Sequence, residues 1–300
     1  MFPKRQFFKS AATVCILSIL SVSVQAQSAV WESTRQAAEK KEKPGTNLRR
    51  WKDHIQEFGL DSTYNHSVSI GGRFNTNGWT GLVAYQRPLK SKRYRGKNKN
   101  AGKSETFQLS FSEVIHEKQI KQQRENTAFP ELGASTPYIF GKINNLYLLQ
   151  LGYGREQMLL PGLIEGNISV SFRYMGGFSL ALLKPYYLKL IQVEYTPEQV
   201  VSLHEQKYSA ANAEVFLSKD RILGSPGFSK GLREISYIPG ALIEGVFVIR
   251  STKSKTFIQI VTLGGQISVH IETLPTMAEL RPRPLQTSLF VGLQVGKMWK

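Results

Sequence analysis

Ionisable residues interrupt stretches of the chain in which polar and apolar residues alternate. If these stretches are the strands of a narrow barrel, the ionisable side chains point into a lumen that side chains just fill. Charges held there are partly dehydrated, so we expect them to pair in a structural network that plugs the lumen. The alternative is a narrow polar path or a proton-linked site. The residues are Arg73, Arg173, Glu244, His270 and Glu272.

A second feature with chemical potential is Gly227-Phe228-Ser229-Lys230-Gly231, which matches the G-x-S-x-G pattern of hydrolase nucleophiles. That pattern activates a serine only where a strand precedes it and a helix follows. Here Pro226 precedes the pattern and the surroundings are typical of a loop. We therefore do not predict a nucleophile at Ser229.

Two histidines lie near acidic residues, as in membrane-embedded acyl hydrolases that combine serine, histidine and an acid at the rim of a small barrel. Glu113 and His116 lie at one predicted strand end, and His270 lies two residues from Glu272. Spacing assigns no serine to either pair, whereas this chemistry needs a nucleophile beside its base. A lipid-modifying enzyme stays an alternative, and we predict no catalytic residues.

The sequence contains no ligand set for a metal or a cofactor. His204-Glu205 lacks the second histidine of H-E-x-x-H, and a glycine-rich loop followed by Lys-Ser/Thr is absent. The single cysteine, Cys15, lies within the export signal described below, which leaves the processed chain without thiol chemistry or disulfides. We expect neither a metal nor a cofactor.

The N-terminus is typical of an export signal. A basic segment with Lys4, Arg5 and Lys9 precedes an apolar stretch at 10–24, and small residues allow cleavage after Ala26. We predict a signal peptide at 1–26. The apolar stretch is shorter than the roughly 18 residues that a membrane-spanning helix needs.

The composition excludes a disordered chain and a collagen-like repeat, since 41% of the 300 residues are hydrophobic. It excludes a disulfide scaffold because the chain has one cysteine. The 39 Lys and Arg outnumber the 22 Asp and Glu, which gives a formal net charge of +17. An exported protein rarely meets nucleic acid, so the expected anionic partners are outer-membrane lipids and lipopolysaccharide. We expect contact with lipid phosphates from Lys90, Lys92, Arg93, Arg95, Lys97, Lys99 and Lys103.

The alternation of polar and apolar residues predicts about eight strands. The polar faces carry Ser, Thr, Gln and Gly, as in a barrel lumen, rather than the Lys/Glu-rich face of a soluble sheet. We therefore predict an all-β fold, a transmembrane antiparallel up-and-down β-barrel at 66–300, with Gly176-Gly177 as a bend inside one long strand. The alternating stretches are 67–74, 106–112, 167–174, 261–272 and 288–296, with weaker candidates at 79–86, 147–154 and 241–249.

The predicted strands imply a topology with both chain ends in the periplasm. Long connections at 117–142, 192–239 and 273–287 then face outward, and short turns at 157–165 and 251–256 face inward. Between the signal and the barrel, residues 27–65 are predicted to form a periplasmic helical lead-in. There, Leu48, Trp51, Ile55 and Phe58 recur at helical spacing after Asn47.

At this point the sequence resembles an uncharacterised family of small outer-membrane β-barrels from Gram-negative bacteria, over about residues 66–300. The resemblance implies the fold and an outer-membrane location, but it implies no activity. The segments that carry it are 140–147 (FGKINNLY), 151–154 (LGYG), 176–188 (GGFSLALLKPYYL) and 227–240, from GFSKG to the final PG.

Together these observations predict a non-enzymatic outer-membrane barrel with a side-chain-filled lumen, acting as a structural or interaction component of the cell envelope. The 192–239 connection is the expected surface for other envelope proteins. A narrow pore and a lipid-modifying enzyme are the alternatives.

Overall fold

The computed structural model describes residues 66–89, 93–94, 97–98, 103–123, 134–160, 168–195, 199–251 and 257–299. The predicted signal peptide and helical lead-in lie outside these residues. Within them, no helix is long and apolar enough to cross a bilayer.

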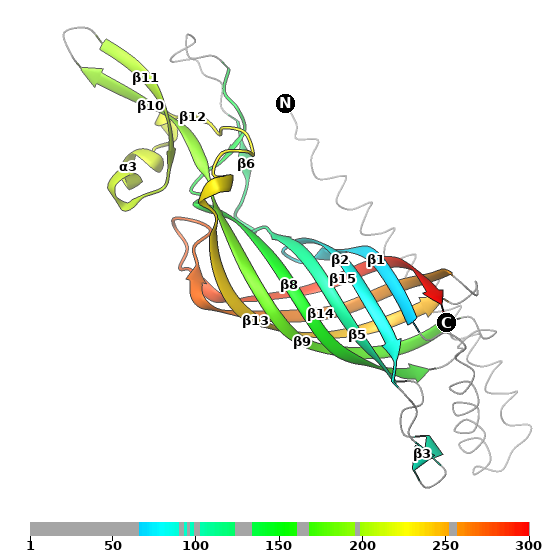
Figure 1. Cartoon of the computed structure of the whole chain (residues 1–300). Helices are drawn as coiled ribbons and strands as arrows, with labels where there is room; N and C mark the ends of the chain where they lie inside the picture. Colours follow the sequence, from blue (N-terminus) through cyan, green and yellow to red (C-terminus); the bar gives the residue numbers. More distant parts are fainter. Residues whose placement is uncertain are drawn as a thin grey trace, which may run out of the picture. The chain divides into compact units, whose positions relative to one another are not determined.

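The described chain is built around a closed antiparallel barrel (Figure 1). Each barrel strand pairs with the barrel strand before it and the one after it, and β1 pairs with β15 to close the sheet, with His66 opposite Trp299. This confirms the predicted up-and-down order of eight strands. The strands are β1 (His66–Asn75), β2 (Gly78–Pro88), β5 (Lys103–Val114), β8 (Asn144–Leu160), β9 (Ile168–Pro185), β13 (Ser236–Ser251), β14 (Phe257–Leu274) and β15 (Arg283–Trp299).

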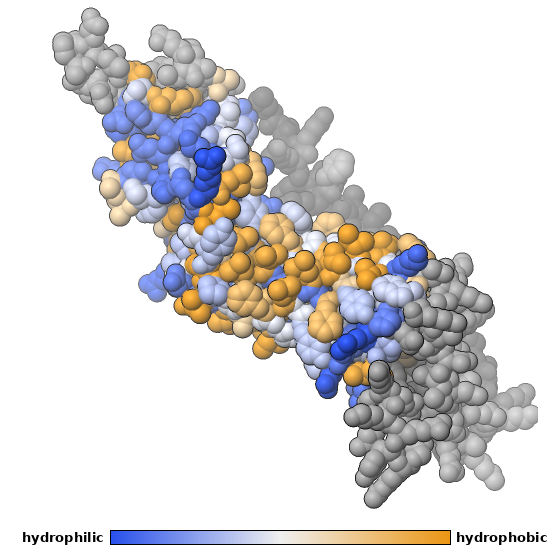
Figure 2. All heavy atoms as spheres, viewed as in Figure 1, coloured by the Kyte–Doolittle hydropathy of each residue, from blue (hydrophilic) through white to orange (hydrophobic). Residues whose placement is uncertain are grey.

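The exterior of the barrel is apolar on every strand, and the apolar surface forms a band on the face shown in Figure 2. Phe74 is 80% exposed and Ile243 is 71% exposed. A water-soluble protein rarely exposes such a continuous apolar surface. A closed barrel with such an exterior satisfies its backbone internally and suits a bilayer, so the predicted outer-membrane barrel is confirmed. One exposed residue from each strand shows the pattern: Ile70, Val83, Leu109, Leu151, Phe178, Ile243, Leu263 and Leu293.

Two glycine positions explain local features of the barrel. Gly78, at the tight turn between β1 and β2, has φ 141°, a conformation that a side chain would strain. The Gly176-Gly177 pair lies inside the continuous strand β9, as predicted. A side chain at Gly177 would collide with the Leu151 carbonyl of β8, so glycine lets the two strands approach closely there.

The two ends of the barrel differ. At one end, here called the terminal end, β1 begins and β15 ends. The other end is here called the loop end. The connection between β2 and β5, at the terminal end, contains a small hairpin of β3 (Arg93–Tyr94) and β4 (Lys97–Asn98). At the loop end, β6 (Lys121–Gln122) pairs with β7 (Tyr138–Ile139).

Residues 186–235, here called the head, connect β9 to β13 at the loop end. Their sheet has the order β11 (Gln199–Lys207), β10 (Tyr187–Tyr195), β12 (Ile222–Gly224). A core of Tyr138, Leu188, Leu190, Phe216 and Ile222 holds this sheet against the α3 helix (Ala213–Phe216). Short 3-10 turns complete the head: η2 (Ala210–Asn212), η3 (Lys219–Arg221) and η4 (Leu232–Glu234).

The connections differ in two respects from the sequence-based expectation. The connection expected at 192–239 runs over 186–235 and contains strands, because Leu188 and Leu190, two residues apart on one face of β10, pack in the head core. The connection expected at 273–287 is shorter, since β14 extends to Leu274 and β15 begins at Arg283, where these two residues pair.

A charge placed on the exterior tests the orientation of the barrel wall. Ile243→Arg should destabilise the barrel in liposomes by about 2–4 kcal/mol, because the side chain lies near the middle of β13 and would face acyl chains. Denaturant titration of the protein in liposomes measures this loss, with Ile243→Leu as the control. An unchanged free energy of unfolding for Ile243→Arg would mean that this wall faces water.

Candidate functional site

The centre of the lumen contains a buried ion pair that joins two well-separated walls. Arg73 on β1 donates from Nη1 to Glu244 Oε2 (2.7 Å) and from Nη2 to Oε1 (3.0 Å) on β13. Strands β14 and β15 lie between β1 and β13 in the sheet, so this bidentate contact crosses the interior. Gln108 on β5 accepts from Arg73 Nη2 at 2.9 Å. Both ionic side chains are 1% exposed.

The same arginine also stacks on an aromatic ring. The Arg73 guanidinium carbon lies 4.2 Å from the centroid of the Phe290 ring on β15. Stacking and bidentate pairing are the contacts to which a planar guanidinium is suited. Arg73 is thus held from three strands besides its own, which makes it the central tie of the lumen.

A second charged cluster lies toward the terminal end. Arg250 on β13 donates from Nη2 to Glu156 Oε1 on β8 (2.9 Å) and to Gln86 Oε1 on β2 (2.9 Å). In the closed sheet, β13 and β2 have three strands between them in either direction, so the Arg250–Gln86 contact spans opposite walls. Arg173 on β9 lies opposite Glu156 in register and is buried, and its Nε and Nη2 have no hydrogen-bond partner among the described residues.

A chain of polar side chains lies between the central cluster and the loop end. Ser110 donates to Gln150 Oε1 (3.4 Å), and Gln150 donates to Ser179 Oγ (3.4 Å). Ser179 Oγ lies 3.2 Å from His270 Nε2, and His270 Nδ1 lies 3.3 Å from the Pro284 carbonyl oxygen.

This serine–histidine pair does not form an accessible catalytic site. Ser179 is 0% exposed and His270 is 4% exposed, so neither lipid nor a solute from the water phase reaches the hydroxyl. The second ring nitrogen of His270 contacts a backbone carbonyl where a catalytic triad would place a carboxylate. The pair therefore serves to satisfy buried polar groups within the wall.

Apolar side chains close the lumen around these polar clusters. Leu146, Leu148, Leu183 and Leu274 form a core near the loop end together with Ala181 and Ile238. A second core occupies the wall formed by β13, β14 and β15. It consists of Val246, Val248, Ile258, Ile260 and Phe290.

The structure brings together only part of the predicted lumen network. Arg73 and Glu244 pair, while Arg173 and His270 are buried elsewhere in the lumen. Glu272 is exposed and does not belong to the network. The pairing of β14 with β13 ends at His270, and its register with β15 shifts between Val269 and Leu274, so no enclosing wall faces Glu272.

Four members of the two charged clusters were not among the predicted network residues: Gln86, Gln108, Glu156 and Arg250. Arg250 lies six residues after Glu244 and therefore on the same face of β13, a signal that the alternation already contained. Glu156 has the same relation to Gln150 on β8. Both charges lie toward strand ends, where alternation by itself does not tell a lumen position from a rim position.

The other predicted residues fall into three groups. Lys103 begins β5 at the terminal end, whereas the side chains of Lys90, Lys92, Arg93, Arg95, Lys97 and Lys99 lie outside the described residues. Ser229 is exposed in a turn followed by the three-residue η4, which is not a nucleophile elbow. Glu113 accepts a hydrogen bond from the Trp79 indole (2.8 Å), and His116 Nδ1 accepts from the Lys118 backbone.

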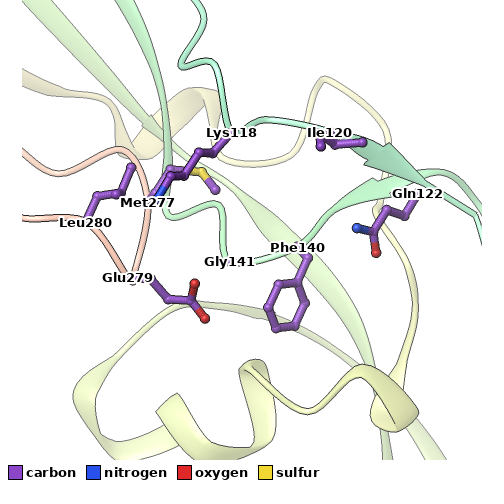
Figure 3. A pocket seen from close by; sticks show the side chains of 8 residues that line it. All are labelled: Lys118, Ile120, Gln122, Phe140, Gly141, Met277, Glu279 and Leu280. Carbon is purple, nitrogen blue, oxygen red and sulfur yellow. The ribbon is translucent and has the colours of Figure 1, made fainter.

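A small recess of about 210 Å³ lies at the loop end beside the head. Its lining comes from segments 118–122, 140–141 and 277–280, and Figure 3 shows the Glu279 carboxylate and the Phe140 ring directed toward the space between these segments. Lys142, the neighbour of Gly141, is buried; its Nζ donates to Gln119 Oε1 (2.9 Å) and lies 5.5 Å from the Tyr186 ring centroid. Burial lowers the pKa of Lys142 from 10.5 to about 8.

Comparisons with solved structures find small outer-membrane barrels. Neisserial surface protein A has a TM-score of 0.36 and 6% identity, with 79% of this chain and 96% of that chain covered. The N-terminal barrel of Pseudomonas aeruginosa OprF has a TM-score of 0.31 and 10% identity, covering 79% and 98%. Yersinia pestis Ail, the attachment invasion locus protein, has a TM-score of 0.33 and 7% identity, covering 79% and 99%. No protein-family model matches the sequence, nor does any curated protein. At these identities and TM-scores the comparisons assign no family.

The central ion pair gives a testable prediction. Glu244→Gln should lower the free energy of unfolding by about 3–5 kcal/mol, because it leaves the Arg73 charge buried without its partner. The double variant Arg73→Met/Glu244→Gln should lose less than the single one, since no unpaired charge remains.

Denaturant unfolding of the detergent-solubilised protein measures these differences. Arg87→Gln is the matched control: it removes an ion pair of 2.8 Å with Glu105, but the Arg87 side chain is 51% exposed. We expect that control to cost under about 1 kcal/mol. Equal losses for Arg87→Gln and Glu244→Gln would contradict a special role for the lumen pair.

The buried Lys142 gives a prediction on pH dependence. Its pKa is lower in the folded chain than in the unfolded chain, so between these values the unfolded state binds more protons and stability rises with pH. From about pH 7.5 to 9.5 the gain should be on the order of 1–2 kcal/mol. Unfolding of Lys142→Met across this range should lack the gain, whereas the exposed-site control Lys118→Met should keep it. A gain of equal size in both variants would assign it to other groups.

Proposed function

We propose that this protein is a non-enzymatic outer-membrane barrel that acts as a structural or interaction component of the cell envelope. Its lumen would serve as a rigid, closed support, and its head would supply the contact surface. The observation that carries the proposal is the combination of a lumen crossed by the Arg73–Glu244 pair with an ordered sheet of three strands at one end of the barrel.

The orientation follows from the connections. Outer-membrane barrels have short turns on the periplasmic side and longer loops on the outside. The connections 186–235 and 115–143 leave the loop end, and both are longer than every connection at the terminal end, where 89–102, 161–167 and 252–256 lie. We therefore assign the loop end, with the head, to the cell exterior.

The filled lumen favours a structural role for the barrel over that of a pore. The two charged clusters tie opposite walls, and apolar cores fill the interior beside them. A barrel of eight strands has an interior just wide enough for such filling. A solute path would have to break the Arg73–Glu244 contact, at the cost of a buried charge.

The head is organised as a firm surface. Glu234 accepts from Lys207 (2.6 Å) and from the Tyr187 hydroxyl (2.6 Å), and Lys230 pairs with Glu205 (2.8 Å). The hydrogen bond from Lys207 holds the pKa of Glu234 below its usual value, and the hydrogen bond to Glu234 raises the pKa of Tyr187 to about 12. Networks of this kind order side chains that are otherwise free in solvent, which favours binding of a partner.

At the terminal end, the basic segment 90–103 stays our proposed contact with lipid phosphates of the inner leaflet. Only Lys103 of that set has a described side chain, so the head offers the sharper test of an interaction role.

Site-specific photocrosslinking in native outer membranes tests the proposal. A photoreactive residue at Leu203, which is 38% exposed on β11 of the head, should give adducts with an envelope protein. The same residue at Leu263, on the apolar exterior of β14, should give lipid adducts only. Adducts with a protein at Leu263 and none at Leu203 would reverse the assignment of the contact surface, and free monomer at both positions would contradict the interaction role.

A further inference from the structure

Aromatic side chains mark the lipid–water boundary on the outer face near the loop end. The Trp79 and Phe111 rings lie 6.4 Å apart, and Phe111 stacks on Tyr147 at 5.6 Å. In the sheet, Tyr147 is opposite Leu182 of β9, and Leu182 is opposite Tyr237 of β13. Aromatic girdles of membrane proteins lie at the level of the headgroups. Residues just beyond this row on β9 therefore face lipid headgroups.

Lys184 is the next outward-facing residue of β9 beyond Leu182. Its neighbour Leu183 belongs to the lumen core, so Lys184 points to the outside of the wall. It is nevertheless buried, because the turn at 226–231 folds over it. Lys184 Nζ donates to the Phe228 carbonyl oxygen (2.5 Å) and lies 3.9 Å from the centroid of the Phe228 ring. Among the described residues no carboxylate forms an ion pair with it.

The turn is anchored tightly to the end of the barrel wall. Gly231 has φ 84°, and a Cβ there would lie 2.8 Å from the Pro185 carbonyl oxygen and 3.3 Å from the Tyr187 ring. Only glycine combines this conformation with such close approach. The turn and η4 are therefore held at the headgroup level, where Phe228 is 68% exposed and Leu232 and Arg233 are also exposed.

Some charged side chains around this turn have ionic partners and others have none, and those without a partner could bind a ligand. Lys230 is neutralised by Glu205, and Glu234 is engaged by Lys207 and Tyr187. Among the described residues Arg233 forms no ion pair, and the Lys184 ammonium has no charged partner: it donates to the Phe228 carbonyl and lies over the Phe228 ring. Figure 2 shows hydrophobic and strongly hydrophilic residues side by side in the region where Figure 1 draws the turn between the head and β13.

We propose that Lys184, Phe228, Leu232 and Arg233 form a binding site for the phosphorylated, acylated glucosamine headgroup of lipopolysaccharide, its lipid A. The Arg233 guanidinium would pair with a lipid A phosphate, with Lys184 adding positive potential beneath it. Phe228 and Leu232 would contact the first methylenes of the acyl chains. This inference rests on the proposed orientation, which exposes the loop end to the outer leaflet, where that lipid resides.

Binding of defined lipids to the full-length, detergent-folded protein tests the site. Native mass spectrometry would compare bis-phosphorylated lipid A, chemically dephosphorylated lipid A and phosphatidylglycerol. We expect the phosphorylated form to bind the wild-type protein most tightly. Equal binding of dephosphorylated lipid A would overturn phosphate recognition, and equal binding of phosphatidylglycerol would overturn the choice of lipid A.

Two charge variants in the same turn provide the matched comparison. Arg233→Gln should weaken lipid A binding about tenfold, the loss expected for one charge-assisted contact. Lys230→Gln removes the same charge from the turn, but from a residue already paired with Glu205, and should change binding less than about twofold. Phe228→Ala should weaken binding of the acylated lipid while the barrel stays folded.

Heat-modified mobility on gels checks that each variant forms the barrel. If Arg233→Gln and Lys230→Gln weaken binding equally, the effect is one of net charge and the site is wrong. If both bind like the wild type, lipid A contacts another surface. Insertion of the folded barrel together with Leu203 crosslinks would keep the proposed function while this lipid site failed.

Discussion

Pairing of every backbone polar group within the sheet is the constraint on which the rest of this structure depends. In hydrocarbon an unpaired N–H or C=O group costs several kcal/mol, so the sheet must close. It closes where β1 pairs with β15 along its length, from His66 opposite Trp299 to Asn75 opposite Phe290. Closure with eight strands then sets the width of the interior. Every inward side chain must find a partner or pack within that width.

The lumen is the direct consequence of this limited width. Two arginines reach partners on other strands with their planar groups: the buried Arg73 meets Glu244, and the half-buried Arg250 meets Glu156 and Gln86. Breaking such contacts is costly because the remaining charge stays dehydrated. Ion pairs and hydrogen bonds therefore connect opposite walls across the lumen. Polar residues inside a barrel thus need not form a path for solutes.

At the loop end the surface of the protein changes from one that faces hydrocarbon to one that faces water. Aromatic rings lie at the boundary, and immediately beyond them Lys184 is covered by the Phe228 turn. Beyond this level the chain changes from a membrane surface to a water-exposed sheet with its own core around Phe216. The head thus has a source of order independent of the barrel.

The alternation of residue types determined by itself the strands, the antiparallel barrel and the faces of Arg73, Arg173, Glu244 and His270, because a two-residue period alone decides which side of a strand each residue occupies. Which charges meet was decided only by closure: Arg73 and Glu244 are 171 positions apart and on non-adjacent strands, so no local pattern relates them. Tertiary structure likewise decided that Glu272 is not part of the lumen network, because the pairing of β14 with β13 ends at His270. It also showed that Arg250 and Glu156 belong to the network. It also turned the G-x-S-x-G segment into a cover over Lys184, because the fate of a loop depends on the surface against which it packs.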